Sequence, residues 1–152
     1  MRGRVLALAV AACAALVLVL GAQWVLNQQS RVRQLALVDG AMAGAEALLH
    51  AQAAVGNARR YEKDLFLNIA KPAAVAKYRQ QWSETVVVAH RRIEEASRLL
   101  SPAEQPAVAQ LKQGIAQYER GMRSVISAIE AGQLTDPVAG NRAVDPYKDA
   151  IR

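Results

Sequence analysis

The chain has 152 residues, with 19 Lys and Arg against 13 Asp and Glu, a net charge of +6 and one cysteine. A single cysteine excludes an intrachain disulfide. The basic excess is mild, and it is not gathered into a stripe with interleaved aromatic residues, which argues against a nucleic-acid-binding protein.

Residues 5–22 form an unbroken apolar run, VLALAVAACAALVLVLGA, and the first acidic residue of the chain is Asp39. A helix of about 20 apolar residues is long enough to cross the ~30 Å hydrocarbon core of a bilayer. Counting through to Leu26, we predict a transmembrane helix over residues 5–26, with residues 1–4 as a tip before it. Trp24 stands near its end, where an indole prefers the membrane–water interface.

Two other interpretations of this run remain open. The arginines at the N-terminus suit a signal peptide cleaved near Leu20-Gly21-Ala22, although the apolar region of a signal is usually only about 7–15 residues long. Val10-Ala11-Ala12-Cys13 loosely fits a lipoprotein signal, but the apolar residues after Cys13 do not suit a mature N-terminus. We favour a retained anchor. Its orientation is not decided by charge, because two arginines precede the span and two follow it closely.

Residues 27–152 are rich in good helix formers, and the positions of proline and glycine predict where helices begin and end. These boundary signals are Lys71-Pro72, Ser101-Pro102, Gly132, Asp136-Pro137 and Asp145-Pro146. Glu104 completes a capping box with Ser101, and Pro102 suits the first helical position. We therefore predict helices over about 27–70, 72–100 and 102–132, and a fourth that begins at about 137 or 146.

Apolar residues recur at heptad spacing in each long helix, as in helices that pack side by side. The third helix has Val108, Leu111, Ile115, Tyr118, Met122, Val125 and Ile129. The second has Val75, Tyr78, Trp82, Val86, Ala89, Ile93, Ala96 and Leu100. The first has Leu35, Val38, Met42, Ala45 and Leu49. Long helices joined by short turns predict an all-α, up-down antiparallel bundle.

The fourth element is short, so three long helices have only part of a fourth to close their core. We expect Ile115, Met122 and Ile129 to be exposed unless something else covers them. The sequence therefore indicates either a fragment of a longer protein or a partner chain that supplies the missing face.

Along the heptad positions of the first helix, the residues are apolar in the proximal half and become polar and basic in the distal half. Continuing its heptad from Leu49 gives Gln52, Gly56, Arg59, Lys63 and Phe66, which would place two basic residues in a niche for a carboxylate. Alternatively, the apolar stripe drifts relative to a strict heptad and passes through Leu48, Val55, Tyr61, Leu65 and Ile69. Arg59 and Lys63 would then lie in water, with Glu62 and Asp64 near enough to neutralise them, and this second alternative is favoured.

No catalytic or metal-binding constellation is evident. His50 and His90 are isolated, whereas a zinc site needs three or four convergent ligands. There is no glycine-rich phosphate loop and no nucleophile elbow. Tyr78 and Trp82 are expected to be core residues. We predict a protein that is not an enzyme and that has no cofactor.

Residues 58–69 (ARRYEKDLFLNI), followed by residues 75–82 (VAKYRQQW), resemble the periplasmic four-helix-bundle sensor region of bacterial methyl-accepting chemotaxis proteins. Residues 118–121 (YERG) and residues 142–151 resemble parts of its third and fourth sensor helices. The resemblance is one of pattern and spacing, extends over essentially the whole chain, and is strongest at the turn that ends the first helix.

This resemblance implies a protein of the bacterial inner membrane, with a cytoplasmic tip at residues 1–4, a first transmembrane helix at 5–26 and a periplasmic sensor domain at 27–152 whose fourth helix is incomplete. Such receptors are homodimers that respond to a small ligand or to a periplasmic binding protein. They continue into a second transmembrane helix and a cytoplasmic part that contacts a kinase. The chain would therefore be the N-terminal part of a receptor.

Related aspartate receptors hold the carboxylates of their ligand with arginines of the first sensor helix. Arg59 and Arg60 stand in a broadly similar place, so the resemblance implies that they would bind a small anionic ligand. Lys63 joins them as a candidate because the heptad places it one turn from Arg59. Two alternatives to a chemotaxis receptor remain: the sensor region of another membrane transducer such as a histidine kinase, and a free-standing membrane-anchored accessory bundle.

Overall fold

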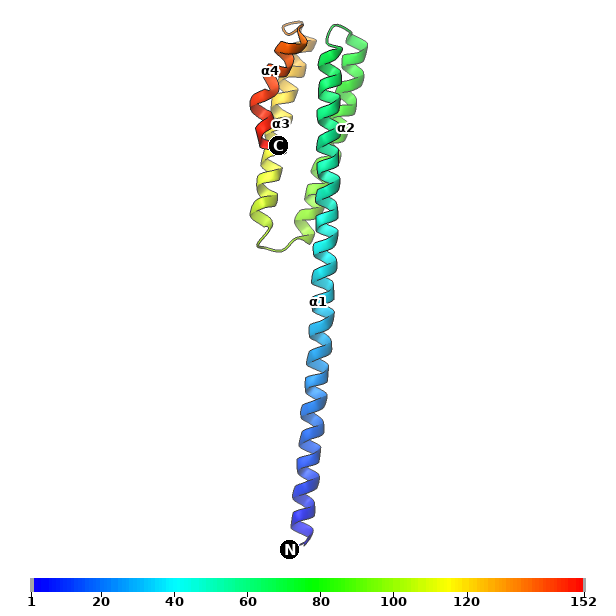
Figure 1. The fold of residues 1–152 in the computed structure, drawn as a ribbon, viewed down its shortest axis with the longest axis vertical. Coiled ribbons are helices and arrows are strands. Elements are labelled where there is room, and N and C mark those ends of the chain that lie inside the picture. Colours follow the sequence, from blue (N-terminus) through cyan, green and yellow to red (C-terminus); the bar gives the residue numbers. More distant parts are fainter. Residues whose placement is uncertain (1, 152) are drawn as a thin grey trace. The chain divides into compact units, whose positions relative to one another are not determined.

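The computed structural model describes the backbone of residues 2–151, together with the side chains of Gln23, Trp24, Asn27, Gln28 and Arg31 and those of residues 38–149 and 151. The elements are α1 (Arg2–Leu67), α2 (Pro72–Leu99), α3 (Gln105–Glu130), α4 (Pro137–Lys148) and a short 3-10 helix, η1 (Asp149–Ile151) (Figure 1). No strand occurs in residues 2–151, so the predicted all-α class is confirmed.

The chain divides into two compact units, residues 1–40 and residues 41–152. Most side chains of the predicted span, 5–26, lie outside the described residues, so the span stays a prediction. Within the part that is described, none of the helices combines the length and apolar character that a membrane crossing requires.

Two of the predicted helix ends are formed by the residues named for them. Gly132 has a φ of 70° after the end of α3, and the N–H of Gln133 donates to the carbonyl of Ala128 at 2.9 Å, closing the helix. The Asp136 carboxylate accepts a hydrogen bond from the N–H of Ala139 at 2.8 Å, and Pro137 begins α4. The fourth helix therefore begins at 137, and the other candidate start, at Pro146, lies inside it.

The predicted start of the third helix at residue 102 is wrong. Residues 102–104 form a turn, and α3 begins at Gln105. Both the backbone N–H and the hydroxyl of Ser101 donate to the Glu104 carboxylate, at 2.9 and 2.8 Å. Only the glutamate half of the capping box is therefore made, because the Ser101 hydroxyl serves as a donor and does not accept from the first turn.

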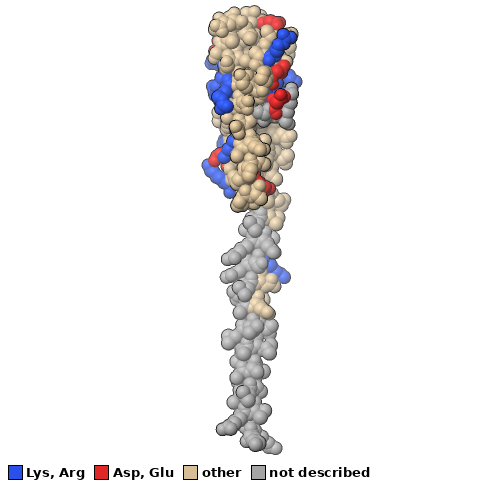
Figure 2. Space-filling view, turned by 90° about the vertical axis from the view of Figure 1, so that its left-hand side faces the viewer, with Lys and Arg blue, Asp and Glu red and all other residues tan. Residues whose placement is uncertain are grey.

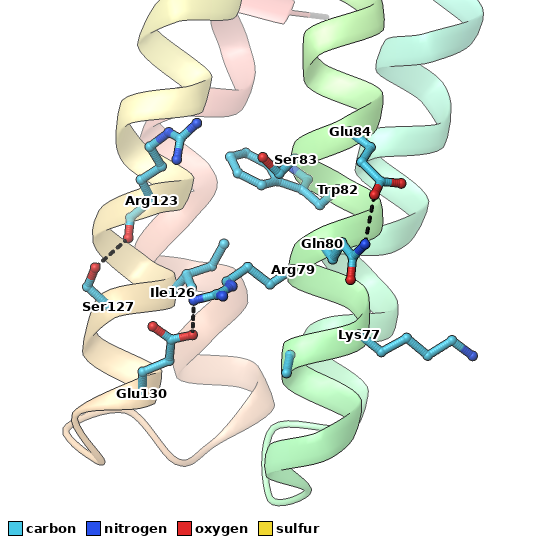
Figure 3. Close-up of a pocket in the computed structure, with 11 residues that line it drawn as sticks. Lys77, Arg79, Gln80, Trp82, Ser83, Glu84, Arg123, Ile126, Ser127 and Glu130 are labelled. Carbon is cyan, nitrogen blue, oxygen red and sulfur yellow. Dashed lines mark hydrogen bonds and ion pairs between the residues drawn. The ribbon is translucent and has the colours of Figure 1, made fainter.

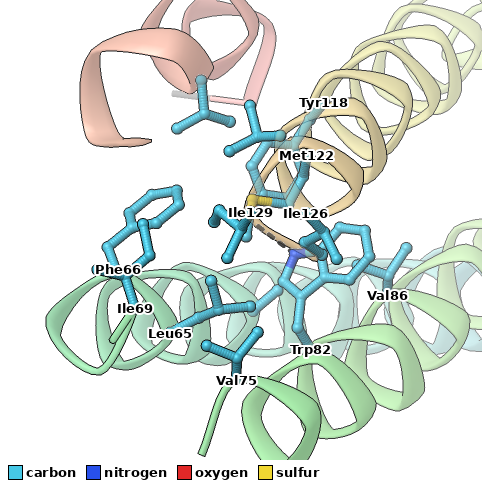
Figure 4. Packing of buried hydrophobic residues seen from close by; sticks show 13 residues of the cluster. Leu65, Phe66, Ile69, Val75, Trp82, Val86, Tyr118, Met122, Ile126 and Ile129 are labelled. Carbon is cyan, nitrogen blue, oxygen red and sulfur yellow. Dashed lines mark hydrogen bonds between the residues drawn. The ribbon is translucent and has the colours of Figure 1, made fainter. Parts of the chain in front are cut away.

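The core of the second unit lies between its helices and contains the large side chains predicted for it (Figure 4). The predicted stripes of α2 and α3 are confirmed: in α3 every named residue is buried except Leu111, which is 43% exposed. Trp82 and Tyr118 are the largest fully buried side chains. Aromatic side chains of this size supply much of the apolar area that a small core can bury.

The stripe predicted for the first helix is wrong where the structure describes it, because Val38, Met42, Ala45 and Leu49 are exposed. The buried face of α1 lies two residues further along and consists of Ala47, Ala51, Ala54 and Ala58. Alanines let neighbouring helices approach closely, and the larger leucines are left outside. Beyond them, Leu65 and Ile69 are buried, which supports a drifting stripe over the strict heptad.

The expectation that Ile115, Met122 and Ile129 would be exposed is also wrong, since all three are buried. Met122 and Ile129 share a buried cluster with Val144 of α4. Ile115 belongs to a second cluster, against which Ile151 of η1 packs. An apolar groove of about 520 Å³ nevertheless remains, lined by α1 residues such as Leu48 and Val55 and by Ile93, Leu111, Ile115 and Ile151.

Two glycines let α4 pack closely on the other helices. A Cβ atom added to Gly121 of α3 would lie 2.2 Å from the ring of Tyr147, and one added to Gly140 of α4 would lie 2.9 Å from the ring of Phe66. Both distances are shorter than van der Waals contact. These positions therefore have no room for a larger side chain while α4 keeps its place.

On the face of the second unit seen in Figure 2, acidic and basic side chains are interspersed along the edges, with other residues between them. Mixed signs are typical of a solvated surface and do not create the single-sign field that attracts a polyanion.

We predict that Gly121→Ala destabilises the second unit, because the new methyl group collides with the Tyr147 ring. Overpacking of this kind lowers the free energy of unfolding by about 1–3 kcal/mol. The matched control is Gly56→Ala, also on a helix, whose Cβ would meet nothing within 4 Å. It should raise stability by about 0.5–1 kcal/mol. Urea unfolding measures both, and a Gly121→Ala chain as stable as the control would contradict this packing.

Candidate functional site

Among the described residues, Glu62 and Lys148 are the charged side chains that are buried, with 1% and 4% of their surfaces exposed. Lys148 Nζ lies 3.1 Å from Glu62 Oε1, so the two form an ion pair between the end of α4 and the distal part of α1. Charged groups are found fully buried only where other groups replace the water they lose.

The second oxygen of Glu62 is also occupied. The Tyr118 hydroxyl donates to Glu62 Oε2 at 2.8 Å, and Trp82 Nε1 donates to the Tyr118 hydroxyl oxygen at 3.1 Å. The two rings meet edge to face, with centroids 6.2 Å apart. Each of the four helices therefore supplies one side chain to a continuous buried network: Glu62, Trp82, Tyr118 and Lys148.

Lys148 has two further partners on α4 itself. Its ammonium group donates to Asn141 Oδ1 at 2.7 Å and to Asp145 Oδ1 at 2.9 Å. With Glu62, these account for the three donors that an ammonium group carries. A fully satisfied network of this kind favours one arrangement of the helices, since any other leaves a buried polar group without a partner.

Burial, together with the adjacent negative charge of Glu62, raises the pKa of the Tyr118 hydroxyl far above its ordinary value. The hydroxyl is therefore protonated at neutral pH and acts as the donor to the carboxylate. The arrangement holds a buried ion pair in a fixed orientation.

A second feature is a groove of about 720 Å³ between α2 and α3 (Figure 3). Arg79 reaches across it to Glu130, with Nη1 and Oε1 2.7 Å apart. Further along, the Arg123 guanidinium lies 5.9 Å from the centre of the Trp82 ring. The groove thus presents polar and charged groups of both signs above an apolar base that includes Ile126.

Arg123 also pairs with Glu119, which accepts at 2.8 Å from His90 of α2. Burial tends to raise the pKa of Glu119, but the hydrogen bonds from Arg123 and His90 outweigh it, so this pKa lies below its ordinary value. The His90–Glu119 hydrogen bond and the ion pairs Arg79–Glu130 and Lys112–Glu94 connect α2 to α3.

The candidate ligand-binding residues Arg59, Arg60 and Lys63 lie together on the distal part of α1 and differ in exposure. Arg59 is half-buried, whereas Arg60 and Lys63 are exposed. The Arg60 guanidinium lies over the ring of its neighbour Tyr61, 5.1 Å from the centroid. None of the three lines either groove described above. The suggestion that Glu62 serves to neutralise these residues is wrong, because its carboxylate is turned into the core toward Lys148.

The histidines lie at different places in the bundle. His50 is exposed and stands 3.6 Å from Glu46, and His90 is the partner of Glu119. Among the described residues, no group of three or more His, Cys, Asp and Glu side chains is placed to hold a metal ion.

Sequence reasoning missed the buried network, although one signal pointed to it. The alanines at 47, 51, 54 and 58 step by four, three and four residues, and the next step of four reaches Glu62. A carboxylate in the middle of a buried stripe requires a buried partner. Nothing in the sequence identifies Lys148 as that partner, because the two are 86 positions apart.

The second unit is thus an antiparallel helical bundle with a polar network at its centre. Comparison of the chain with protein-family models, with curated proteins and with solved structures gives no match.

We predict that Lys148→Met lowers the free energy of unfolding by about 3–5 kcal/mol, because it leaves the buried Glu62 carboxylate without its counter-ion. Glu62→Gln should cost less, because Lys148 keeps its ion pair with Asp145. The double variant should lose much less than the two losses combined, since it removes both charges. Urea unfolding of the parent chain, the two single variants and the double variant gives the interaction free energy between residues 62 and 148. Additive losses would show that the two groups do not interact.

A second prediction concerns alkaline pH. The folded chain holds the Tyr118 proton more tightly than the unfolded chain, whose tyrosines titrate near about 10. The free energy of unfolding should therefore fall as the pH rises above about 10. In Tyr118→Phe this decline should be shallower than in the parent chain. Thermal unfolding between about pH 8 and 11 measures the slopes, and identical slopes in the parent and the variant would be inconsistent with a buried, paired hydroxyl.

Proposed function

We propose that the chain is the sensory input region of a bacterial chemotaxis receptor. It would be anchored in the inner membrane by residues 5–26, with its bundle in the periplasm. The observation that carries the proposal is the position of α4. This helix packs on α1 and α3 through a buried ion pair, two close contacts at glycines and Val144 in the core. Because such contacts either form or break, a change elsewhere in the bundle would be passed on through the position of α4.

The apolar run at residues 5–22 and the resemblance of residues 58–82 to sensor regions of this class support the same proposal. We propose a binding role without catalysis, in a homodimer formed through the bundle. The ligand would be a small anion or a periplasmic binding protein. In this proposal the surface around Arg59, Arg60 and Lys63 would contact the anion.

Joining the chain to the second transmembrane helix and cytoplasmic part of a characterised chemotaxis receptor tests the receptor function. The hybrid should control the receptor's kinase, and L-aspartate, L-glutamate or succinate should change kinase activity. Lys148→Met in the hybrid should alter kinase activity without any ligand, because α4 loses its position, whereas Gly56→Ala should not. A hybrid that is stable in the membrane but insensitive to all three compounds and to Lys148→Met would contradict the proposal.

The ligand site has a separate test. Calorimetry of the full chain in lipid nanodiscs with succinate, L-aspartate and L-glutamate should detect binding. Arg59→Ala and Lys63→Ala should each weaken it by about tenfold or more, since a hydrogen bond between charged groups contributes about 1.5–3 kcal/mol. Arg98→Ala, which removes an exposed arginine of α2, is the control. Unchanged affinity in both test variants would eliminate this site.

A further inference from the structure

The groups around the Lys148 ammonium have the composition of a binding site. Glu62 provides a carboxylate with 1% of the residue exposed. The Tyr118 hydroxyl donates a hydrogen bond to the second oxygen of that carboxylate, and Trp82 Nε1 donates to the Tyr118 hydroxyl oxygen. These three side chains come from α1, α2 and α3, whereas the cation they surround comes from α4.

We propose that Glu62, Tyr118 and Trp82 form a binding site for a primary ammonium group, and that Lys148 fills this site as an internal ligand. A free alkylammonium ion of the same shape would occupy the site when the Lys148 side chain is absent. The ligand class is a primary amine on a short unbranched apolar chain. This inference does not depend on the proposed receptor function.

The helices that supply the acceptors around the Lys148 ammonium group support the idea that the ammonium can leave the site formed by Glu62. Of the three acceptors around Lys148 Nζ, Asn141 and Asp145 belong to α4 itself. If α4 moves away, the lysine keeps these two partners, and Asp145 is half exposed already. Among the described residues, Lys148 is the ion-pair partner given for Glu62, whose other oxygen accepts from the neutral Tyr118 hydroxyl. When the lysine leaves, the buried carboxylate keeps that hydrogen bond and loses its ion-pair partner.

The helix that delivers Lys148 contains Pro146, which has no N–H to donate to the preceding turn. The contacts of its buried face therefore matter for the position of α4. Lys148 at its last position is one of those contacts, and its four-carbon stem explains the preference for an unbranched chain.

Lys148→Ala removes the atoms of an n-propylammonium ion, so this ion is the probe. Urea unfolding of the variant is measured with n-propylammonium chloride and with sodium chloride at equal ionic strength. We expect the amine to lower the equilibrium constant for unfolding by about tenfold at ten times its dissociation constant. If the variant is unfolded alone, the amine should restore its helical circular dichroism.

Two controls separate this site from a general effect of the salt. In Lys148→Met the thioether side chain fills the space, and in Glu62→Gln/Lys148→Ala the anionic acceptor is gone, so neither variant should respond. Tetramethylammonium, which has no N–H donor, should not stabilise Lys148→Ala. The proposal is overturned if n-propylammonium leaves Lys148→Ala unchanged at every concentration, or if it acts equally on the two control variants.

Discussion

A carboxylate and an ammonium group that leave water together lose several kcal/mol of hydration each, and they regain it only at close range and with every other donor and acceptor satisfied. Glu62 and Lys148 meet this condition, with Tyr118, Asn141 and Asp145 as the remaining partners. The pair adds little net stability compared with a well-packed apolar pair, but it makes other arrangements of the helices costly. The position of α4 depends on it.

The close packing around α4 favours the same position of this helix as the Glu62–Lys148 ion pair does. Gly121 leaves room for the Tyr147 ring one residue before Lys148, and Gly140 leaves room for Phe66. Val144 lies in the main core with Met122 and Ile129. A shift of α4 along its axis would remove the lysine from Glu62 and drive a ring into a helix backbone at the same time. The observed position of α4 is therefore favoured over small displacements, because a half-broken pair leaves a charge in the core.

The ion pairs between α2 and α3 have a different character. The side chains of Arg79–Glu130 are 52% and 42% exposed and those of Lys112–Glu94 are 36% and 52% exposed, so water and salt screen both pairs and each contributes little to stability. Their effect is on the alignment of the two helices and on the chemistry of the groove between them. The bundle therefore combines a buried ion pair with an outer surface of mixed charge.

The sequence by itself determined the helical class, the end of α3 at Gly132, the start of α4 at Pro137 and the buried stripes of α2 and α3. These features follow from local chemistry: caps, prolines, a left-handed glycine and heptad spacing within one helix. The buried face of α1 was not determined in this way, because alanines give a weak hydrophobic signal and the leucines beside them a strong one. Only the tertiary structure decided that Ala47 to Ala58 face inward and that Lys148 is the partner of Glu62. Such a pairing depends on how separate helices come together in space, and no pattern within a single helix records it.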